Sequence, residues 1–332
     1  MNKILLIGGA GFIGHNLAIS LKNSNYDVEI IDNLKINNLY HFQKTDIDNR
    51  NIYMNFINQR LEYLKKLKIP VHEFDARNYD GLKTLIESIK PDVVIHFAAV
   101  AHANKSNKDP HTTFDNSFLT LENALDSSRD FVKHFIYFSS SMVYGNFLTG
   151  SVTEDSICEP LGIYGALKYA GEKIVIAYNQ VFDLPYTIIR PSALYGPRCV
   201  SRRVGQIFIE NAILNKPINI NGTGEEKLDF TYIDDLVQGV TKVIENSNSL
   251  NQIFNLTFGE GRKVNDMVQI LKSEFPELEI NYLPKDKLMP DRGTLSVQKA
   301  IDMIGYKPEY PIDKGYLDYI KWYKEIKINK MR

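Results

Sequence analysis

The chain has 332 residues, of which 44% are hydrophobic and 24% charged, as in a soluble globular protein long enough for about two domains. Its 39 basic and 40 acidic side chains give a formal net charge of −1, so no overall positive field attracts nucleic acid or an anionic membrane. Cys158 and Cys199 are too few for a disulfide framework, and no apolar run approaches the ~20 residues of a membrane span. We therefore expect a cytoplasmic protein that binds neither nucleic acid nor membrane.

Short apolar runs alternate with helical patterns through the first half of the chain. This alternation is typical of a parallel sheet with helices on both faces. Several runs are apolar on both faces, as a covered parallel sheet requires. The expected strands cover residues 4–7, 28–31, 71–74, 93–97, 135–139 and 187–190, and the expected helices cover 81–89, 112–127 and 164–181.

The segment 35–70 is long for a connection between strands. It has apolar residues at helical spacing: Ile57, Leu61, Leu64 and Leu67. We therefore expect a helix to interrupt it. From about residue 192 the alternation becomes irregular, with more loops, prolines and isolated helices. A smaller second domain built against the sheet is the simplest interpretation.

The stretch GGAGFIG places Gly8, Gly11 and Gly14 between the first strand and the first helix. This spacing lets a backbone approach a pyrophosphate closely, while the helix N-terminus supplies free N–H groups. Asp32 ends the second strand, 18 residues after Gly14 (32 − 14), close to the ~20 expected for a ribose-binding acid. A carboxylate there accepts hydrogen bonds from the ribose hydroxyls and repels a 2′-phosphate. The pattern predicts NAD as cofactor in preference to NADP.

These elements predict an α/β fold with a doubly wound Rossmann sheet and a smaller α/β substrate domain. We expect residues 1–182 to form the NAD-binding domain, with part of 225–255 returning to it. Residues 183–332 would form mainly the substrate-binding domain.

The stretch YGALK places Tyr164 and Lys168 four residues apart, and therefore on one face of a helix. Lowering a tyrosine pKa by ~3 units, so that it acts as a base near neutral pH, requires about 4 kcal/mol. One ammonium group about 4 Å away supplies roughly that much. The pair alone is a common surface pattern. After a glycine-rich cofactor loop and a serine-rich strand end, it indicates a catalytic base.

With these motifs together, the chain resembles the extended short-chain dehydrogenase/reductase superfamily, in particular the nucleotide-sugar epimerases and dehydratases. The resemblance covers nearly the whole length. It rests on GGAGFIG, IIDNL, EFDARN, HFAA, SSSMVYG, TEDSICEPLGIYGALK, RPSALYGPR and LDFTYIDDL.

The resemblance implies a role for each catalytic residue. Ser140 would hydrogen-bond the reacting sugar hydroxyl, Tyr164 would be the general base, and Lys168 would hold the nicotinamide ribose and tune Tyr164. Asp75 and Ala76 would lie at the adenine. The implied cofactor contacts are Gly8, Gly11, Phe12, Ile13, Gly14, Asp32, Asn33, Asp75, Ala76, Phe97, Ala98, Ala99, Asn116, Tyr164, Lys168 and Pro191.

The expected substrate site departs from the family pattern at two positions. Ala193 stands where many relatives have an asparagine at the substrate diphosphate, and Leu228 where many have a phosphate-clamping arginine. Nearby arginines suit phosphate or carboxylate recognition, although each equally fits a solvated turn. The expected substrate contacts are Ser141, Met142, Ala193, Arg198, Arg202, Arg203 and Arg292.

Met142 bears on the reaction. The dehydratases and decarboxylases that the chain resembles carry an acidic residue at this position, and a thioether can neither donate nor accept that proton. We therefore predict a nucleotide-sugar 4-epimerase. We further expect a homodimer without a bound metal and a role in the synthesis of surface-polysaccharide precursors. The alternatives are a 4,6-dehydratase, decarboxylase or 4-dehydrogenase on the same scaffold, or a non-catalytic NAD-sensing regulatory protein. The complete Ser140, Tyr164 and Lys168 set disfavours the last of these.

Overall fold

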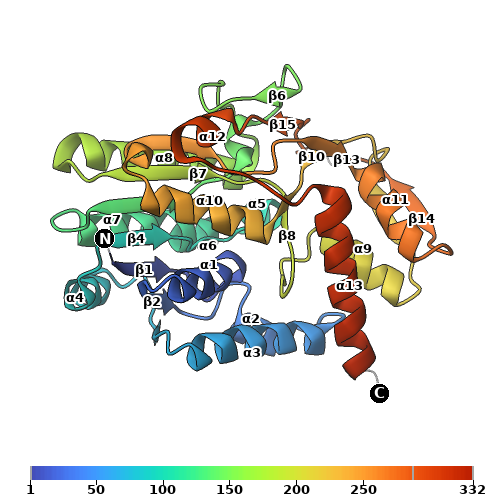
Figure 1. Ribbon diagram of the computed structural model, residues 1–332, viewed down its shortest axis with the longest axis horizontal. Helices are drawn as coiled ribbons and strands as arrows, with labels where there is room; N and C mark the ends of the chain where they lie inside the picture. Colours follow the sequence, from blue (N-terminus) through green and yellow to red (C-terminus); the bar gives the residue numbers. More distant parts are fainter. Residues whose placement is uncertain (1, 286–287, 331–332) are drawn as a thin grey trace.

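The computed structural model describes residues 2–285 and 288–330, and its centre is a sheet of seven parallel strands (Figure 1). The predicted Rossmann arrangement is confirmed, because the first strand lies inside the sheet and the chain winds outward from it in both directions. In order across the sheet the strands are β12 (Gln252–Asn255), β7 (Tyr186–Arg190), β5 (His134–Phe138), β4 (Val93–His96), β1 (Lys3–Ile7), β2 (Asp27–Asp32) and β3 (Val71–Glu73).

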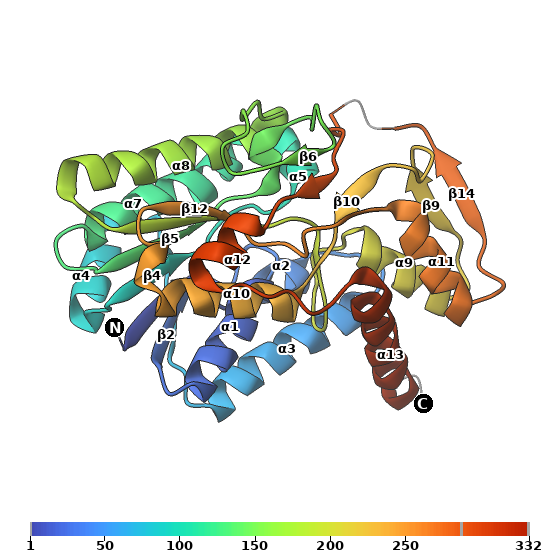
Figure 2. The same ribbon diagram turned by 45° about the horizontal axis from the view of Figure 1, so that its top comes forward.

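Helices cover both faces of this sheet, which therefore forms the middle of three layers (Figure 2). The strands are apolar on both sides because alternate residues point into different cores. In β1, Ile4 and Leu6 enter one core while Leu5 and Ile7 enter the other. The first core is covered by α1 (Phe12–Asn23), α3 (Arg50–Lys66) and α10 (Ile233–Glu245). The second is covered by α4 (Tyr79–Ile89), α7 (Thr120–Ser128) and α8 (Gly162–Phe182).

The second half of the chain adds small elements beside the carboxyl ends of the strands. In Figure 1, α9, α11, α13 and β14 stand together at one side of the main sheet. The remaining helices of this half are α9 (Val204–Ile213), α11 (Val264–Glu274), α12 (Gln298–Ile304), α13 (Ile312–Lys330) and the one-turn η3 (Ser247–Ser249), which precedes β12 at the amino end of that strand. The strands pair as β6 (Ser151–Val152) with β15 (Thr294–Leu295), β8 (Leu194–Tyr195) with β11 (Thr231–Tyr232), β9 (Ile218–Asn221) with β14 (Ile280–Leu283), and β10 (Lys227–Asp229) with β13 (Gly261–Lys263).

Three details differ from the sequence expectation. The segment 35–70 contains two helices, α2 (Leu39–Lys44) and α3, where one was expected. The helix expected over 112–127 is built from α6 (Pro110–Phe114), the π-helical turn η1 (Asp115–Leu119) and α7, and follows the short α5 (Ala103–Lys108). Strand β12 was not anticipated as a strand, yet it pairs with β7 along its full length.

None of the helices in the described part of the chain has the length and apolar character needed to cross a bilayer.

Candidate active site

A cavity of about 400 Å³ opens at the carboxyl ends of the central strands. Its wall combines residues that follow β1, β2, β4, β5 and β7 with Asn221 and Arg292 from the second half of the chain. This edge of a doubly wound sheet, where the strand order reverses, is the usual ligand site of such folds. Of the site residues predicted from sequence, all line the cavity except Asp75, Arg198 and Arg202.

The three glycines of the first loop serve different purposes. Gly8 has φ +78°, and a Cβ there would lie 2.7 Å from the backbone nitrogen of Ala98. A Cβ on Gly14 would lie 2.4 Å from the carbonyl oxygen of Gly9, so both positions are glycine for packing reasons. Gly11 has an ordinary φ of −73°, and its nearest neighbour would be 3.4 Å away. Since packing does not require Gly11, its missing side chain leaves room for a ligand.

The first turn of α1 completes this cradle. Gly11 is the N-cap and provides no side-chain cap, so the N–H groups of Phe12 and Ile13 start a helix whose positive end faces the cavity. A pyrophosphate fits such a position because it supplies the missing acceptors. The residues present therefore fit a dinucleotide.

Asp32 lies at the end of β2, beside the glycine loop. Its Oδ2 accepts a hydrogen bond from the backbone N–H of Ala10 at 3.0 Å, and its Oδ1 accepts one from Leu34 at 2.8 Å. Burial raises the pKa of Asp32 to about 6, against the lowering effect of these two donors and of Arg60. Each carboxylate oxygen can accept a further hydrogen bond, as ribose hydroxyls would require. Asn33, the next residue, accepts from the N–H of Lys35 at 3.0 Å.

Asp75 pairs with Arg77 and does not line the cavity. Arg77 donates two parallel hydrogen bonds to it, from Nε at 2.9 Å and from NH2 at 2.7 Å, and Lys35 lies 3.4 Å away. The Arg77 guanidinium holds the pKa of Asp75 well below its usual range. The adjacent Ala76 lines the cavity, so this loop contributes to the wall through Ala76.

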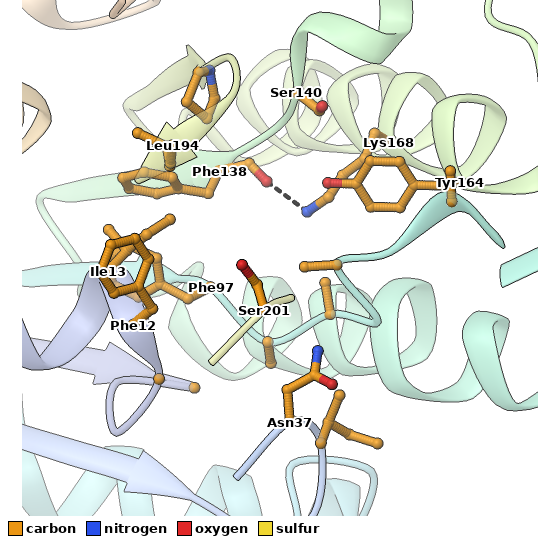
Figure 3. Close-up of a pocket in the computed structure, with 18 of the residues that line it drawn as sticks. Phe12, Ile13, Asn37, Phe97, Phe138, Ser140, Tyr164, Lys168, Leu194 and Ser201 are labelled. Carbon is orange, nitrogen blue, oxygen red and sulfur yellow. Dashed lines mark hydrogen bonds between the residues drawn. The ribbon is translucent and has the colours of Figure 1, made fainter. Parts of the chain in front are cut away.

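The residues predicted to be catalytic converge on one end of the cavity (Figure 3). Tyr164 and Lys168 lie one turn apart on α8, and the Lys168 ammonium donates to the Phe138 carbonyl at 2.6 Å. Burial lowers the pKa of Lys168 to about 7, although Glu172, one turn further along, raises it. The Lys168 ammonium therefore loses its proton more readily than a solvated lysine does. A further negative group nearby would raise its pKa again.

Ser140 caps the 3₁₀ turn η2 (Ser141–Tyr144) that follows β5. Its Oγ accepts the N–H of Met142 at 3.2 Å, which fixes the side chain at the cavity wall. Among the described residues nothing receives a hydrogen bond from this hydroxyl, so its proton is available to a substrate oxygen. Both Ser140 and Tyr164 are 8% exposed, which keeps bulk water away from the reaction.

Asn116 enters the cavity from the π-helical turn η1. Its amide donates to the Thr112 carbonyl at 2.8 Å, and its own carbonyl accepts from the Thr120 hydroxyl at 3.1 Å. Both bonds compete with the regular helical ladder, and π-helical turns are frequent at functional sites.

Two arginines in the wall come from the second half of the chain. Arg203 donates from NH2 to the Ala101 carbonyl at 2.7 Å. The NH2 group of Arg292 contacts the sulfur of Met142. Burial lowers the pKa of Arg292 to about 10, and the positive charge of Arg203 lowers it further. The Met142 side of the cavity therefore carries a guanidinium beside the thioether.

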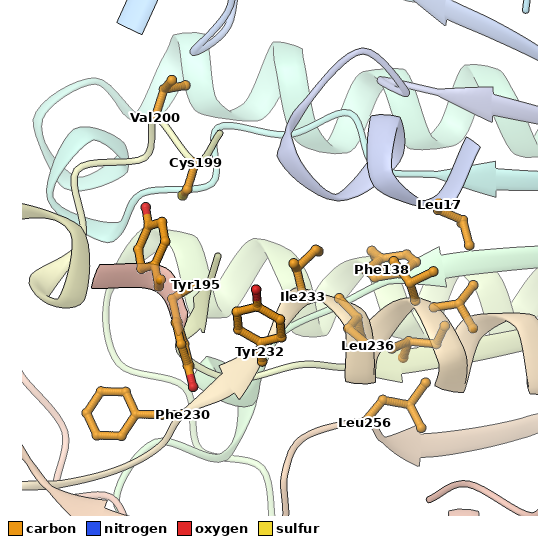
Figure 4. Packing of buried hydrophobic residues seen from close by; sticks show 14 of the residues in the cluster. Leu17, Phe138, Tyr195, Cys199, Val200, Phe230, Tyr232, Ile233, Leu236 and Leu256 are labelled. Atoms are coloured by element: carbon orange, nitrogen blue, oxygen red, sulfur yellow. The ribbon is translucent and has the colours of Figure 1, made fainter. Parts of the chain in front are cut away.

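Arg198 and Arg202 do not reach the cavity. Arg198 lies over the ring of Tyr63 at 5.2 Å, and its Nε donates to His15 Nε2 at 3.3 Å. The backbone N–H of Arg202 donates to the Gln206 side chain, at the start of α9. Both residues have positive φ, 61° and 53°, and these turns direct their side chains away from the wall. Neighbouring Cys199 is buried and belongs to the same hydrophobic core cluster as Tyr195 (Figure 4).

Arg60 is a wall residue that the sequence analysis missed. It lies on α3, and its Nε donates to the Arg198 carbonyl at 3.1 Å, which fixes the loop that carries Arg203. Its NH1 has no hydrogen-bond partner among the described residues. The available signal was its position on the buried face of α3, three residues after Ile57 and four before Leu64.

Comparisons with known proteins show the family of the chain. The profile of the NAD dependent epimerase/dehydratase family matches residues 4–257. A putative UDP-glucose 4-epimerase of Methanocaldococcus jannaschii is 32% identical, over 97% of this chain and 98% of its own length.

Solved structures are similar to this one over nearly the whole chain. The UDP-glucuronic acid 4-epimerase of Bacillus cereus, crystallised with UDP-glucuronic acid and NAD, superposes with a TM-score of 0.86 at 27% identity, covering 98% of this chain and 99% of its own. The UDP-glucose 4-epimerase of Thermotoga maritima, crystallised with UDP-glucose, has a TM-score of 0.85 at 26% identity with the same coverage. On the profile match and the relative at 32% identity, the chain belongs to the NAD dependent epimerase/dehydratase family.

Proposed function

We propose that the protein is an NAD-dependent nucleotide-sugar 4-epimerase. The observation that carries the proposal is the meeting of Ser140, Tyr164 and Lys168 at one end of a cavity whose other end has the features of a dinucleotide cradle. The family is NAD-dependent, and similar structures are epimerases crystallised with UDP-sugars.

Each of the three residues has a task in the reaction. Tyr164 removes the proton from the hydroxyl on sugar carbon 4, and Ser140 donates a hydrogen bond to the same oxygen. The Lys168 ammonium stabilises the Tyr164 phenolate, and the Phe138 carbonyl keeps it in place at 2.6 Å. When bound, NAD would supply reversible hydride transfer at carbon 4, so that a keto sugar that has turned over is reduced on its opposite face. Tyr164 then gives the proton back to the new hydroxyl.

The cofactor residues divide along the cavity. Phe12 and Ile13 would bind the pyrophosphate through the start of α1, and Asp32 would bind the adenosine ribose. Ala76 would border the adenine, while Phe97, Ala98, Asn116 and Pro191 line the path toward Tyr164.

The chemistry of the Met142 side chain favours epimerisation over elimination or decarboxylation. Met142 lines the reaction end of the cavity, and its thioether can neither protonate a leaving hydroxyl nor accept a carbon proton. The Arg292 guanidinium beside it is charged throughout the physiological range and cannot serve as a general acid there. A dehydratase or decarboxylase would need an acid–base group that none of the described residues on this side of the cavity provides.

The proposal extends to the partner, the cellular role and the location of the protein. The partner is a nucleotide-sugar substrate, and the role is in the synthesis of surface-polysaccharide precursors in the cytoplasm. We retain the homodimer and the division at residue 182 as predictions from the sequence.

The product mass tests the reaction type. The protein is incubated with UDP-, GDP-, CDP- and dTDP-sugars, and the products are identified by NMR and mass spectrometry. A 4-epimerase gives a product of unchanged mass, or one two mass units lighter if the keto sugar escapes. A product lighter by 18 or 44 mass units would show elimination of water or loss of carbon dioxide and would overturn the proposal.

A further inference from the structure

The loop between β8 and α9 forms part of the cavity wall through two left-handed backbone turns. Arg198 and Arg202 have φ 61° and 53°, in the region that favours glycine. Since neither residue is glycine, the surrounding groups must hold both conformations. Val200 and Ser201, between the two turns, and Arg203, after the second, line the cavity. The shape of this wall therefore depends on what fixes residues 198 and 202.

Each turn is fixed by a buried side chain from a helix. Arg60 of α3 donates from Nε to the Arg198 carbonyl at 3.1 Å. The backbone N–H of Arg202 donates to Oε1 of Gln206 at 3.0 Å. Gln206 is the third residue of α9, a position from which a side chain can reach back to the N–H groups that precede a helix. The oxygen end of this amide therefore keeps the second turn in place.

Glu210 determines which end of the Gln206 amide faces the loop. The Nε2 group of Gln206 donates to Oε1 of Glu210, one helical turn further along α9, at 2.8 Å. A carboxylate accepts hydrogen bonds and donates none, so the NH2 end of the amide must face Glu210. The oxygen end then faces the N–H of Arg202. A reversed amide would place its NH2 group against that N–H, and both hydrogen bonds would be lost.

Glu210 is itself held by donors from neighbouring helices. Besides Gln206, it accepts hydrogen bonds from Tyr323 of α13 at 2.7 Å, from Tyr53 of α3 at 2.5 Å and from Asn49, the N-cap of α3, at 3.1 Å. Together these bonds fill the roughly four acceptor positions of a carboxylate. Figure 1 shows α9 beside α13. None of the five residues, all within the described part of the chain, lines the cavity.

We propose that Gln206, oriented by Glu210, is a positioning residue that keeps Arg203 in the substrate wall. The inference rests on the proposed function and on the expected contact of Arg203 with the nucleotide sugar. If the N–H of Arg202 loses its acceptor, residue 202 can leave the left-handed region, which is unfavourable for a residue with a Cβ. That rotation turns the backbone immediately before Arg203 and directs its side chain away from the cavity. Because Tyr164 lies on α8, substrate affinity changes while the chemical step does not.

A double-mutant cycle tests this assignment by steady-state kinetics on the nucleotide sugar that the protein epimerises. Gln206→Met keeps the approximate size of the side chain and removes both of its hydrogen bonds. It should raise KM about 3- to 10-fold, the effect of losing a hydrogen bond, with kcat changed by less than about twofold. Arg203→Met should raise KM further. The double variant should have the KM of Arg203→Met alone, because Gln206 acts through Arg203.

Tyr323→Phe is the matched control. It removes another buried hydrogen bond to Glu210 but leaves the bond between Gln206 and Glu210 intact. It should lower the melting temperature and leave KM at the wild-type value. Glu210→Gln is the second variant, used if Gln206→Met does not fold. It has the shape of the native side chain but no longer dictates the orientation of the Gln206 amide, so KM should again rise with kcat unchanged.

Three results would overturn the assignment. One is an unchanged KM in Gln206→Met or, if that variant does not fold, in Glu210→Gln. Another is a Gln206→Met effect that persists in full beside Arg203→Met, since the glutamine would then not act through this arginine. The third is an equal rise in KM in Tyr323→Phe, which would reduce the effect to a loss of stability.

The proposed function fails separately, if no nucleotide sugar yields a 4-epimer. The same cycle is then measured by calorimetry on NAD-loaded protein, with UDP, dTDP, GDP and CDP as probes. The dissociation constant of the diphosphate that binds takes the place of KM. Equal constants for Gln206→Met and wild type, or for the four diphosphates no binding that Arg203→Met weakens, would overturn the positioning role.

Discussion

Glu172 and Arg190 form a buried pair with two parallel hydrogen bonds, Nε to Oε1 at 2.9 Å and NH2 to Oε2 at 2.7 Å. The two side chains are only 2% and 3% exposed. Ser139 also donates to Glu172 at 2.5 Å, and Arg190 donates to the Tyr144 hydroxyl at 2.9 Å. The pair thus joins α8, β7 and the end of β5 directly behind the catalytic residues.

Glu172→Gln should destabilise the protein by about 3–5 kcal/mol, because it leaves the Arg190 charge buried without its partner. Urea denaturation measures the loss. The exposed pair of Lys216 and Asp48, 3.4 Å apart, provides the control, since Asp48→Asn should change stability by less than about 1 kcal/mol. Similar values for the two variants would contradict the structural importance of the buried pair.

Tyr164→Phe should reduce turnover by at least about 10²- to 10⁴-fold, because it removes the general base and leaves the ring that packs in the wall. NMR of the sugar product measures turnover, while thermal melting and NAD titration show that the variant remains folded and binds cofactor. Substantial residual activity on the true substrate would mean that another group takes the proton.

Gly11→Ala should weaken NAD binding at least about tenfold, or about 1.4 kcal/mol. Its backbone conformation suits alanine and no protein atom obstructs the new Cβ, so stability should be retained. Gly14→Ala is the matched control: its Cβ would collide with the Gly9 backbone, and it should lower the melting temperature. Unchanged NAD affinity in Gly11→Ala would show that the cofactor does not approach this glycine.

The protein should bind NAD more tightly than NADP, because the Asp32 carboxylate repels a 2′-phosphate. Since burial raises the pKa of Asp32 to about 6, NAD affinity should fall as the pH decreases through 6 and the carboxylate becomes protonated. Calorimetry at pH 5 and pH 7.5 measures the change, and Asp32→Asn should abolish it. Equal affinity for the two cofactors would remove Asp32 from this role.

Arg203→Ala should raise the substrate KM by roughly 10- to 150-fold, the effect of losing one charge-assisted contact of about 1.5–3 kcal/mol. Arg202→Ala removes the neighbouring charge, whose side chain does not line the cavity, and should change KM little. Steady-state kinetics on both variants distinguishes a direct contact of Arg203 with the substrate from attraction by the positive charge of the whole loop. An equal rise in KM for the two variants would indicate the second.

Local sequence patterns were sufficient for six of the seven strands of the central sheet. The runs at β1, β2, β4, β5 and β7 are apolar on both faces, and such runs identify buried parallel strands without knowledge of their partners. Strand β12 was missed because QIFN is short and polar at both ends, and only its pairing with β7 makes it a strand.

The arginines show why the rest of the site could not be predicted. Arg198, Arg202 and Arg203 are close in sequence, yet two left-handed backbone turns send only Arg203 into the cavity. The contact between Met142 and Arg292 joins residues 150 positions apart. A long flexible side chain and a distant partner leave no periodic signal. The roles assigned to the individual residues remain predictions.

The place of β12 determines when the protein can fold on the ribosome. This strand supplies the edge of the sheet beyond β7, and α11, α12 and α13 follow it in the chain. A nascent chain that ends between β7 and β12 leaves the N–H and C=O groups of an apolar strand unpaired, and such an edge invites association with other chains. The cofactor half should therefore aggregate when it is expressed alone from residues 1–190. Extending it through residue 255 should cover β7 with β12, whose polar ends make a less apolar edge.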